Sequence, residues 1–294
     1  MTCNLNPRGL PDKAASAGAD RDGGPELHGR VENLSLTASA FGWLVSGASA
    51  LSGGSTVAME SPFRVCSRKL YFWYFRARGY PGVRLRRSRI TDIVKEYDEV
   101  HSFHLERPEG LRFRPGQHTH LVAPGGYINN HDVRHLSFAS APDEETLLFT
   151  MDLASGSRFK RRFGRARVGD RVGLYSEKGN FTLDDLPERQ PLVLIAGGVG
   201  IAPFRSMIRA GIAQPWHLIY AGRGYCYPEL WNALGPERVT LADRETLGPA
   251  VDARIEEGRL YMVCGSSRFV AAVTARLAGG GVAAERIRVE DYGF

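Results

Sequence analysis

A glycine-rich loop in the last third of the chain has the residue types of a phosphate-binding site. The segment Gly197–Pro203 places three glycines, Gly197, Gly198 and Gly200, ahead of Ile201, Ala202 and Pro203, between an apolar run and a helical stretch. Glycines let a phosphate approach the backbone, and the following helix offers free N–H groups and a positive dipole end. Pro203 suits the first helical turn, where its missing N–H is not needed. The spacing is not the dinucleotide fingerprint, so the loop alone is equally typical of a tight turn in any α/β protein.

Two further loops follow apolar runs in the same half of the chain. Gly222-Arg223 comes after Trp216–Ala221, and Cys264-Gly265 ends the run that begins at Leu260. Open α/β sheets bind ligands beyond the carboxyl ends of their strands, so we expect all three loops at one edge. Arg223 suits a ribose phosphate or a pyrophosphate, or else a surface salt bridge. Cys264 is equally typical of a small buried core residue.

The preceding half of the chain offers two more candidate phosphate contacts. Arg134 and Ser137 stand three positions apart in a segment that runs to Ser140. Their guanidinium and hydroxyl groups suit a diphosphate and a ring edge. Ser155-Gly156-Ser157 opens a basic helix predicted over Phe159–Phe163, where a phosphate could sit. A strand end and an ordinary helix cap explain the same residues.

Short strand-like runs separated by turn residues must position the candidate phosphate contacts at Arg134 and Ser137 and at Ser155–Ser157. These runs are Arg89–Lys95, Val100–Glu106, His118–Val122, Thr146–Asp152, Val168–Tyr175 and Lys178–Leu183. Strands of this length and spacing indicate an antiparallel barrel or sandwich. We predict a barrel domain over residues 89–187.

After Pro187 the pattern changes to strands alternating with helices. The expected strands are Pro191–Ala196, Trp216–Ala221, Leu260–Cys264 and Ile287–Glu290, and the expected helices are Pro203–Ala210 and Arg268–Leu277. This alternation indicates a parallel sheet with crossover helices. We predict a nucleotide-binding α/β domain of the Rossmann-like kind over residues 188–294.

The N-terminal part has a different composition. Residues 1–60 are rich in Gly, Ala, Ser and Asp without periodicity, which predicts a disordered extension. Residues 61–88 form a lead-in whose run Lys69–Arg76 places aromatic rings between basic residues. That run suits a peripheral membrane or partner contact, or packing against the barrel.

Composition narrows the choice of partners and cofactors. The 294 residues carry a net charge of +6, which favours an acidic partner. The basic stretch Arg158–Arg171 suits docking of such a partner, although a solvated helix face explains it as well. The four cysteines are scattered, which excludes an iron–sulfur cysteine cluster on this chain and favours the cytoplasm. We predict neither a metal site nor a transmembrane segment, since no run reaches the ~18–20 apolar residues required.

From about Arg89 to the C-terminus the order of motifs resembles the ferredoxin–NADP reductase superfamily. The matching pieces are Pro115-Gly-Gln117, Arg134-x-Leu-Ser137, Ser155-Gly-Ser157, Gly169-Asp170, Gly179-x-Phe181, Gly197–Pro203, Cys264-Gly265 and Glu290–Phe294. The resemblance implies a flavin-binding barrel followed by a nicotinamide-nucleotide domain.

The same resemblance assigns roles to individual residues. It implies FAD with Arg134 on the pyrophosphate, Leu136, Ser137 and Phe138 along the ring, and Ser155, Gly156 and Ser157 at the phosphates. It implies NADPH or NADH over Gly197–Pro203, Arg223 and Gly265, with Glu290, Tyr292 and Cys264 as catalytic residues where the two rings meet.

Three positions depart from the family pattern. Leu136 stands where Tyr or Phe is usual, which removes one ring contact. Ala202 replaces a usual Thr and Ser266 a usual Pro. The backbone loops that would hold phosphates are unaffected by these changes.

We therefore expect an FAD-dependent NAD(P)H oxidoreductase that passes electrons to a separate acidic protein, ferredoxin- or flavodoxin-like, or to an oxygenase component. The alternative is an electron-transfer or regulatory flavoprotein subunit with little turnover of its own. Nucleic-acid binding has only the basic pI of about 9.2 in its favour, without aromatic residues in a nucleic-acid motif, so we expect none.

Overall fold

The computed structural model describes residues 85–292, all within one compact unit of the chain. The predictions for residues 1–60 and for the aromatic run 69–76 lie outside the described residues, as does most of the lead-in at 61–88. The last two residues of the motif Glu290–Phe294 lie outside them as well.

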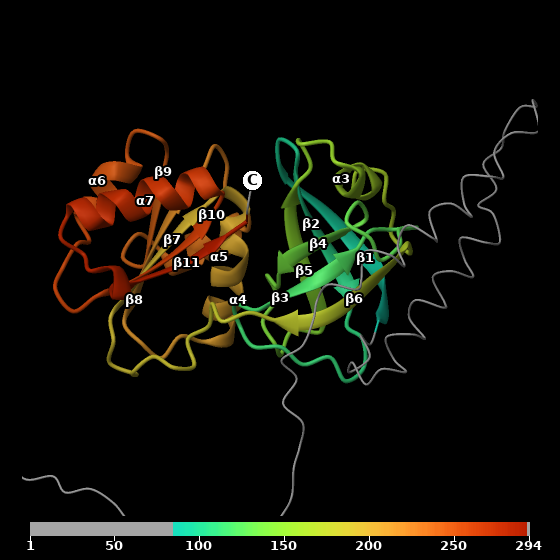
Figure 1. Ribbon diagram of the computed structural model, residues 1–294, viewed down its shortest axis with the longest axis horizontal. Helices are drawn as coiled ribbons and strands as arrows, with labels where there is room; N and C mark the ends of the chain where they lie inside the picture. The colour runs from blue at the N-terminus through green and yellow to red at the C-terminus, as the bar shows by residue number, and fades with distance from the viewer. Residues whose placement is uncertain (1–84, 293–294) are drawn as a thin grey trace, which may run out of the picture. The chain divides into compact units, whose positions relative to one another are not determined.

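The first half of the described chain is an antiparallel six-stranded sheet (cyan to yellow-green in Figure 1). Its strands are β1 (Arg86–Tyr97), β2 (Val100–Glu106), β3 (His118–Val122), β4 (Val133–Ser137), β5 (Thr146–Asp152) and β6 (Arg171–Lys178). They run in the order β4-β3-β6-β1-β2-β5. Just beyond β4, the Ala139 N–H donates to Leu148 O of β5 at 2.9 Å, which connects the two outer strands. The predicted barrel is confirmed.

A short helix, α3 (Arg158–Phe163), lies between β5 and β6 in the chain. Its Phe159 and Phe163 are each 1% exposed, and Phe163 meets Phe103 of β2 edge-on at a centroid distance of 4.9 Å. Packing of these two rings therefore fixes α3 on the barrel core, because burial of an aromatic side chain dominates the energetics of such a contact.

Four details of the predicted barrel differ from the structure. β1 begins at Arg86 rather than Arg89, β6 runs over Arg171–Lys178 rather than Val168–Tyr175, and β4 is a strand that alternation did not reveal. Residues 179–183 are not a strand. Gly179 adopts a φ of +121°, which turns the chain out of the sheet directly after β6.

The second half of the described chain is a parallel five-stranded sheet (yellow to red in Figure 1). Its strands are β7 (Leu192–Gly197), β8 (Trp216–Ala221), β9 (Val239–Ala242), β10 (Leu260–Gly265) and β11 (Ile287–Asp291). They run in the order β11-β10-β7-β8-β9, and every neighbouring pair is parallel. The predicted Rossmann-like sheet is confirmed.

Helices cover both faces of this sheet. They are η1 (Gly198–Ile201), α4 (Ala202–Ala210), α5 (Pro228–Leu234), α6 (Leu247–Asp252), α7 (Ser267–Gly279) and η2 (Ala284–Arg286). Phe204 of α4 and Trp231 of α5 share one core cluster with Cys264, whereas Val251 of α6 and Leu277 of α7 share another with Val263. Cys264 and Val263 are adjacent in β10, so successive side chains supply opposite faces.

The sequence predicted β7, β8, β10, β11, α4 and α7 but missed β9, α5 and α6. β9 has only four residues, and Thr240 and Leu241 between its buried ends are partly or fully exposed. α5 and α6 contain seven and six residues, too few for a clear helical period. Within residues 85–292, no helix combines the length and apolar character needed to cross a bilayer.

Candidate functional site

The ends of β4 and β11 meet through two hydroxyl groups. Tyr292, directly after β11, donates from Oη to Ser137 Oγ at 3.2 Å. Its backbone N–H donates to Gly265 O at 3.1 Å, which ties the same residue to the end of β10. Three predicted site residues, Ser137, Gly265 and Tyr292, thus lie together although the sequence separates them widely.

A histidine–carboxylate pair lies beside this contact. His118 Nδ1 is 3.4 Å from Glu290 Oε1, and His118 is the cross-strand partner of Ser137 in the β3–β4 register. Glu290 is in turn the β10–β11 partner of Cys264. The structure therefore gathers Glu290, Tyr292 and Cys264 around the end of β4. His118 was not predicted, because its sequence position in an alternating strand gives no sign of what it faces.

Burial keeps the Tyr292 hydroxyl and the Cys264 thiol protonated. It raises the pKa of the Tyr292 hydroxyl well above its usual value and that of the Cys264 thiol far above its usual range. Tyr292 also hydrogen-bonds the Cys264 side chain. A thiol in this state donates a hydrogen bond and packs against its neighbours, but it is not a thiolate nucleophile at neutral pH.

Two more histidines lie along the same face of β3 and β4. The His120 ring meets His135 edge-on at 4.0 Å and stacks on Tyr175 at 4.6 Å, while His135 stacks on His118 at 5.5 Å. Burial, followed by the charges of His135 and Lys178, lowers the pKa of His120 to about 4. Burial and the neighbouring His118 also lower the pKa of His135. Both rings are therefore predominantly neutral at pH 7.

Arg134 lies beside the start of α3, as the phosphate prediction requires. Its guanidinium is 5.8 Å from the Phe159 ring centroid and donates to Asn130 O and Val133 O at 2.7 Å each. Ser157 caps the helix by accepting from the Lys160 N–H at 3.4 Å. Gly156 adopts a φ of +59° with open space where a side chain would stand. An arginine, a helix N-cap and a glycine with open space beside it therefore lie on one side of the barrel, where they could contact a phosphate.

The Phe138 side chain is not available to a ligand. It is fully buried and stacks on Phe113 at a centroid distance of 3.9 Å, so it belongs to the barrel core. Only its backbone groups remain for the predicted cofactor contact. Leu136 packs against the same core from a partly buried position.

The three α/β loops lie at the carboxyl edge of the parallel sheet. Register pairs Gly197 with Ala221, and Cys264 with Ala196, so the loops after β7, β8 and β10 begin side by side. The sheet order reverses between β7 and β10, which is the switch point where open α/β sheets bind ligands. Arg223 is exposed and makes no salt bridge to any residue in the range 85–292, which leaves its guanidinium available.

Packing supplies a second reason for the glycines at this edge. A Cβ on Gly197 would lie 2.6 Å from the Phe269 ring, and one on Gly265 would lie 2.7 Å from it. A Cβ on Gly200 would collide with the backbone of Cys264. The sequence interpretation attributed the glycine loop to phosphate approach or to a tight turn, and it missed the packing of the Phe269 ring of α7 against Gly197 and Gly265.

Helix α4 is fastened to the segment that follows β4. Arg205 donates to Ala139 O at 2.7 Å and to Glu144 at 2.8 Å, and Ser206 Oγ donates to Ser140 O at 2.6 Å. Burial would raise the pKa of Glu144, but hydrogen bonds and charge from Arg205 outweigh it and lower the pKa. The helix after the glycine loop is thereby coupled to the strand that carries Arg134 and Ser137.

Known proteins resemble parts of this chain in sequence. No family model matches the chain. It is 36% identical over 115 residues to toluate 1,2-dioxygenase electron transfer component of Pseudomonas putida, covering 37% of this chain and 32% of that protein. It is 26% identical over 223 residues to tetrachlorobenzoquinone reductase of Sphingobium chlorophenolicum, covering 69% and 66%.

A solved structure decides the fold. A ferredoxin NADP+ reductase from Neisseria gonorrhoeae with bound FAD and NADP superposes with a TM-score of 0.58 at 21% identity, covering 71% of this chain and 99% of that one. The chain has the ferredoxin–NADP reductase fold. It spans from about a third to under two thirds of the length of the first curated relatives that it matches.

Within the ferredoxin–NADP reductase fold, the structure explains two of the positions that differ from the family pattern. Ser266, in place of the usual Pro, caps α7 by accepting from the Phe269 N–H at 3.4 Å. Ala202 is 2% exposed in the first turn of α4, where it packs beside Ala139. Among residues 85–292 no cluster of His, Cys, Asp or Glu is arranged to hold a metal ion.

Proposed function

We propose that the chain is an FAD-dependent NAD(P)H oxidoreductase that delivers electrons to a separate redox protein. The contact between Tyr292 and Ser137 carries the proposal. It joins the strand that would hold the flavin to the strand end beside the nucleotide loops, as electron transfer between two cofactors requires.

The residues of the barrel suit an FAD. Arg134 and the cap of α3 would hold its pyrophosphate through charge-assisted hydrogen bonds. Leu136 and Ser137, on the same strand, would contact the ring, with Ser137 supplying a hydroxyl. The open, left-handed Gly156 supports the fit because a phosphate can approach its backbone.

The residues of the α/β domain suit a nicotinamide nucleotide. The N–H groups at Gly198–Ile201 and the first turn of α4 would bind its phosphates, and the exposed Arg223 would add a guanidinium. Gly265 lies across the switch point from Gly197. The position of these loops at the carboxyl edge of the sheet supports this assignment.

When bound, the two cofactors would supply the hydride transfer from nicotinamide to flavin, followed by electron delivery. The protein supplies orientation and hydrogen bonding. Tyr292 and Ser137 offer neutral hydroxyls, and the protonated Cys264 thiol holds Tyr292 in place. Glu290, fixed by His118, adds a carboxylate beside them. Cys264 is fully buried and Tyr292 is partly buried beside it, which would limit the access of water to this part of the site.

The acceptor that we propose is an acidic protein, ferredoxin- or flavodoxin-like, or an oxygenase component. The net charge of +6 supports it by electrostatic steering, and so does the likeness to a dioxygenase electron transfer component. The two described cysteines, Cys226 and Cys264, are free and buried, which supports a reducing, cytoplasmic setting.

The test uses the full chain. Purified protein is examined for a flavin absorption spectrum, reconstituted with FAD, and then assayed with NADH and with NADPH, using ferricyanide and an acidic [2Fe–2S] ferredoxin as acceptors. We expect bound FAD and steady reduction of both acceptors with one of the two nucleotides. Protein that takes up no FAD would overturn the proposal. Bound FAD without turnover of either nucleotide would instead favour an electron-transfer or regulatory subunit.

A further inference from the structure

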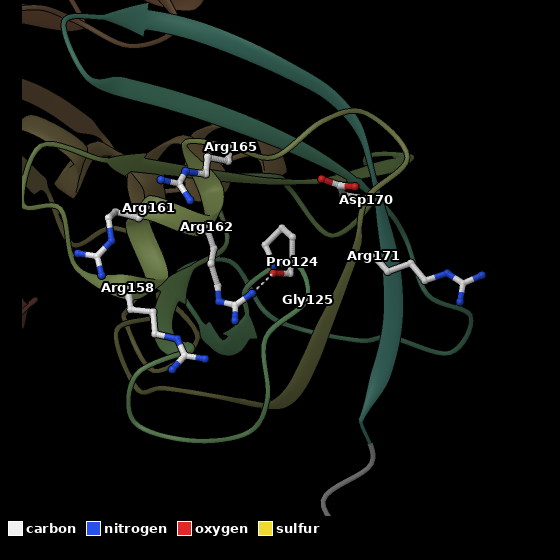
Figure 2. Close-up of a pocket in the computed structure, with 8 residues that line it drawn as sticks. All are labelled: Pro124, Gly125, Arg158, Arg161, Arg162, Arg165, Asp170 and Arg171. Atoms are coloured by element: carbon white, nitrogen blue, oxygen red, sulfur yellow. Dashed lines mark hydrogen bonds between the residues drawn. The ribbon is translucent and has the colours of Figure 1, made fainter. Parts of the chain in front are cut away.

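An arginine-lined groove lies on the outer side of α3 (Figure 2). Its volume is about 670 Å³, and its lining residues come from α3, the loop after β3, the segment between α3 and β6, and the start of β6. They are Pro124, Gly125, Arg158, Arg161, Arg162, Arg165, Asp170 and Arg171. A concave site of this size falls in the range of about 300–1,000 Å³ that holds small ligands.

Two of the five arginines are held in place by a buried carboxylate. Asp132 Oδ1 lies 2.9 Å from Arg158 Nε and 3.1 Å from Arg162 Nε, and the Asp132 side chain is 0% exposed. Arg162 also donates to Pro124 O at 3.0 Å, the bond drawn in Figure 2. These fixed side chains leave less rotamer entropy to be lost when a ligand binds.

The other arginines have no carboxylate of their own. Arg161 donates to the backbone of Gly156, and neither Arg165 nor Arg171 forms an ion pair with any residue between 85 and 292. Among the described residues that line the groove or lie directly beneath it, five arginines stand against two carboxylates, Asp170 at the rim and Asp132 beneath, which is an excess of three positive charges. Such a concentration of like charge in a concavity attracts an anion.

The groove faces away from Arg134 of the proposed flavin pyrophosphate contact and adjoins that contact only where Arg161 donates to Gly156 O. At about 100° per helical residue, positions 158, 161 and 162 share one face of α3, and Arg165 lies in the turn that follows the helix. The core rings Phe159 and Phe163 lie on another side, and Lys160 beyond them. Arg134 packs over Phe159, and after burial its charge is a further cause that lowers the pKa of Lys160.

The lining selects the kind of anion. Guanidinium groups match phosphate oxygens two at a time, which favours ligands with several such oxygens. The lining residues include no aromatic ring on which a base could stack. They also lack the buried aromatic anchors that dominate protein interfaces. We propose that this groove binds a compact anion of two or more linked phosphates, either free or as the diphosphate end of a nucleotide.

The test is a calorimetric titration of the full-length, FAD-reconstituted protein with inorganic pyrophosphate at about 0.15 M ionic strength. We expect saturable 1:1 binding that is at least about tenfold tighter than that of orthophosphate, because linked phosphates engage more guanidinium groups. The double variant R165A/R171A should weaken pyrophosphate binding by about tenfold or more. The matched control R112A/R189A removes two exposed arginines outside the groove and should leave it unchanged.

A parallel titration with ADP identifies the source of the phosphates. ADP binding that R165A/R171A leaves unchanged assigns the groove to a free anion, and ADP binding that is tighter than that of pyrophosphate and is weakened in R165A/R171A assigns the groove to a nucleotide diphosphate. No saturation below about 1 mM pyrophosphate would overturn the proposal and leave an acidic protein partner or a solvated helix face. Release of FAD by pyrophosphate, followed by its absorbance, would also overturn it, since the groove would then belong to the flavin contact.

Discussion

The hydroxyl of Tyr292 donates to the hydroxyl of Ser137 across 155 positions of sequence, at 3.2 Å. Both groups are neutral, and the burial that raises the pKa of Tyr292 keeps its proton in place. The contact therefore persists across the physiological pH range. It holds the end of β11 against the end of β4 without an ion pair.

Removing this hydroxyl tests its importance. We expect Y292F to lower the free energy of unfolding by about 1 kcal/mol, because the ring still packs while one hydrogen bond is lost. Urea unfolding of the full chain measures the change. Y225F is a suitable control, since the Tyr225 hydroxyl donates to Ala242 O at 3.0 Å elsewhere in the α/β domain. The nucleotide oxidation rate is measured for both variants as well. If Y292F and Y225F oxidise the nucleotide at the same rate, whatever their difference in stability, the Tyr292 hydroxyl has no part in the reaction.

Leu136 offers a test of the flavin assignment. A ring at this position would stack against the flavin, and such contacts contribute about 0.5–1.5 kcal/mol. We expect L136Y to tighten FAD binding by roughly two- to tenfold. Fluorescence titration of the apoprotein with FAD gives the dissociation constants, and L136M controls for a change of shape without an aromatic ring. Unchanged affinity in L136Y would place the flavin away from Leu136.

Asp132 is expected to be a structural centre of the α3 side of the barrel. Burial alone would raise its pKa, but hydrogen bonds from Asn129 and Tyr127 and the charges of Arg162 and Arg158 lower it. Loss of a buried ion-pair partner costs about 3–5 kcal/mol, and the partly exposed arginines reduce this to about 2 kcal/mol for D132N. Chemical denaturation checks the value. D170N, at the rim of the groove, should cost under about 0.5 kcal/mol.

The histidines of β3 and β4 predict a pH dependence of stability. A histidine whose pKa is lowered on folding binds its proton more readily in the unfolded chain. The contribution of His120 is therefore complete above pH 6.5 and is lost as the pH falls toward its folded pKa of about 4. Thermal unfolding between pH 7 and pH 4 should show a decline that is shallower in H120N. An identical slope in H120N and the wild type would exclude His120 as a source.

Glu144 is expected to couple α4 to the barrel. It accepts from Arg205 at 2.8 Å and from Arg209 at 3.2 Å. We expect E144Q and R205M each to cost about 1–2 kcal/mol and the double variant to cost less than their sum. A double-mutant cycle measured by urea unfolding gives the coupling energy. R209M, whose side chain is half exposed, should change stability by well under about 1 kcal/mol.

Continuous apolar runs made the parallel sheet predictable. Val193 and Ile195 are buried on one face of β7 and Leu194 on the other, so the strand reads as apolar throughout. β4 could not be found in this way. Arg134, His135 and Leu136 within it are all partly or fully exposed, and their order shows no alternation. Their strand state is set by pairing with β3, a tertiary contact that local sequence does not encode.

The residues of the candidate site that belong to sequence motifs could be predicted. The residues that join the site only through tertiary packing could not. Ser137, Glu290, Tyr292 and Cys264 were predicted as site residues from the order of motifs along the chain, and they lie near one another in the structure. His118 was not, because its role depends on Glu290 reaching it from a strand 172 positions later. Arg205 and Ser206 lie in the predicted helix Pro203–Ala210, where the sequence assigned them no role. Only the fold shows that they face the chain after β4.

The Phe269 ring gives the glycines of the switch point a shared evolutionary constraint. It lies within 2.7 Å of where a Cβ would stand on either Gly197 or Gly265, in two neighbouring strands. Neither glycine can change while this ring is present, whatever ligand the loops hold. The three positions should therefore covary among close homologues, with a smaller side chain at 269 wherever alanine replaces glycine at 197 or 265.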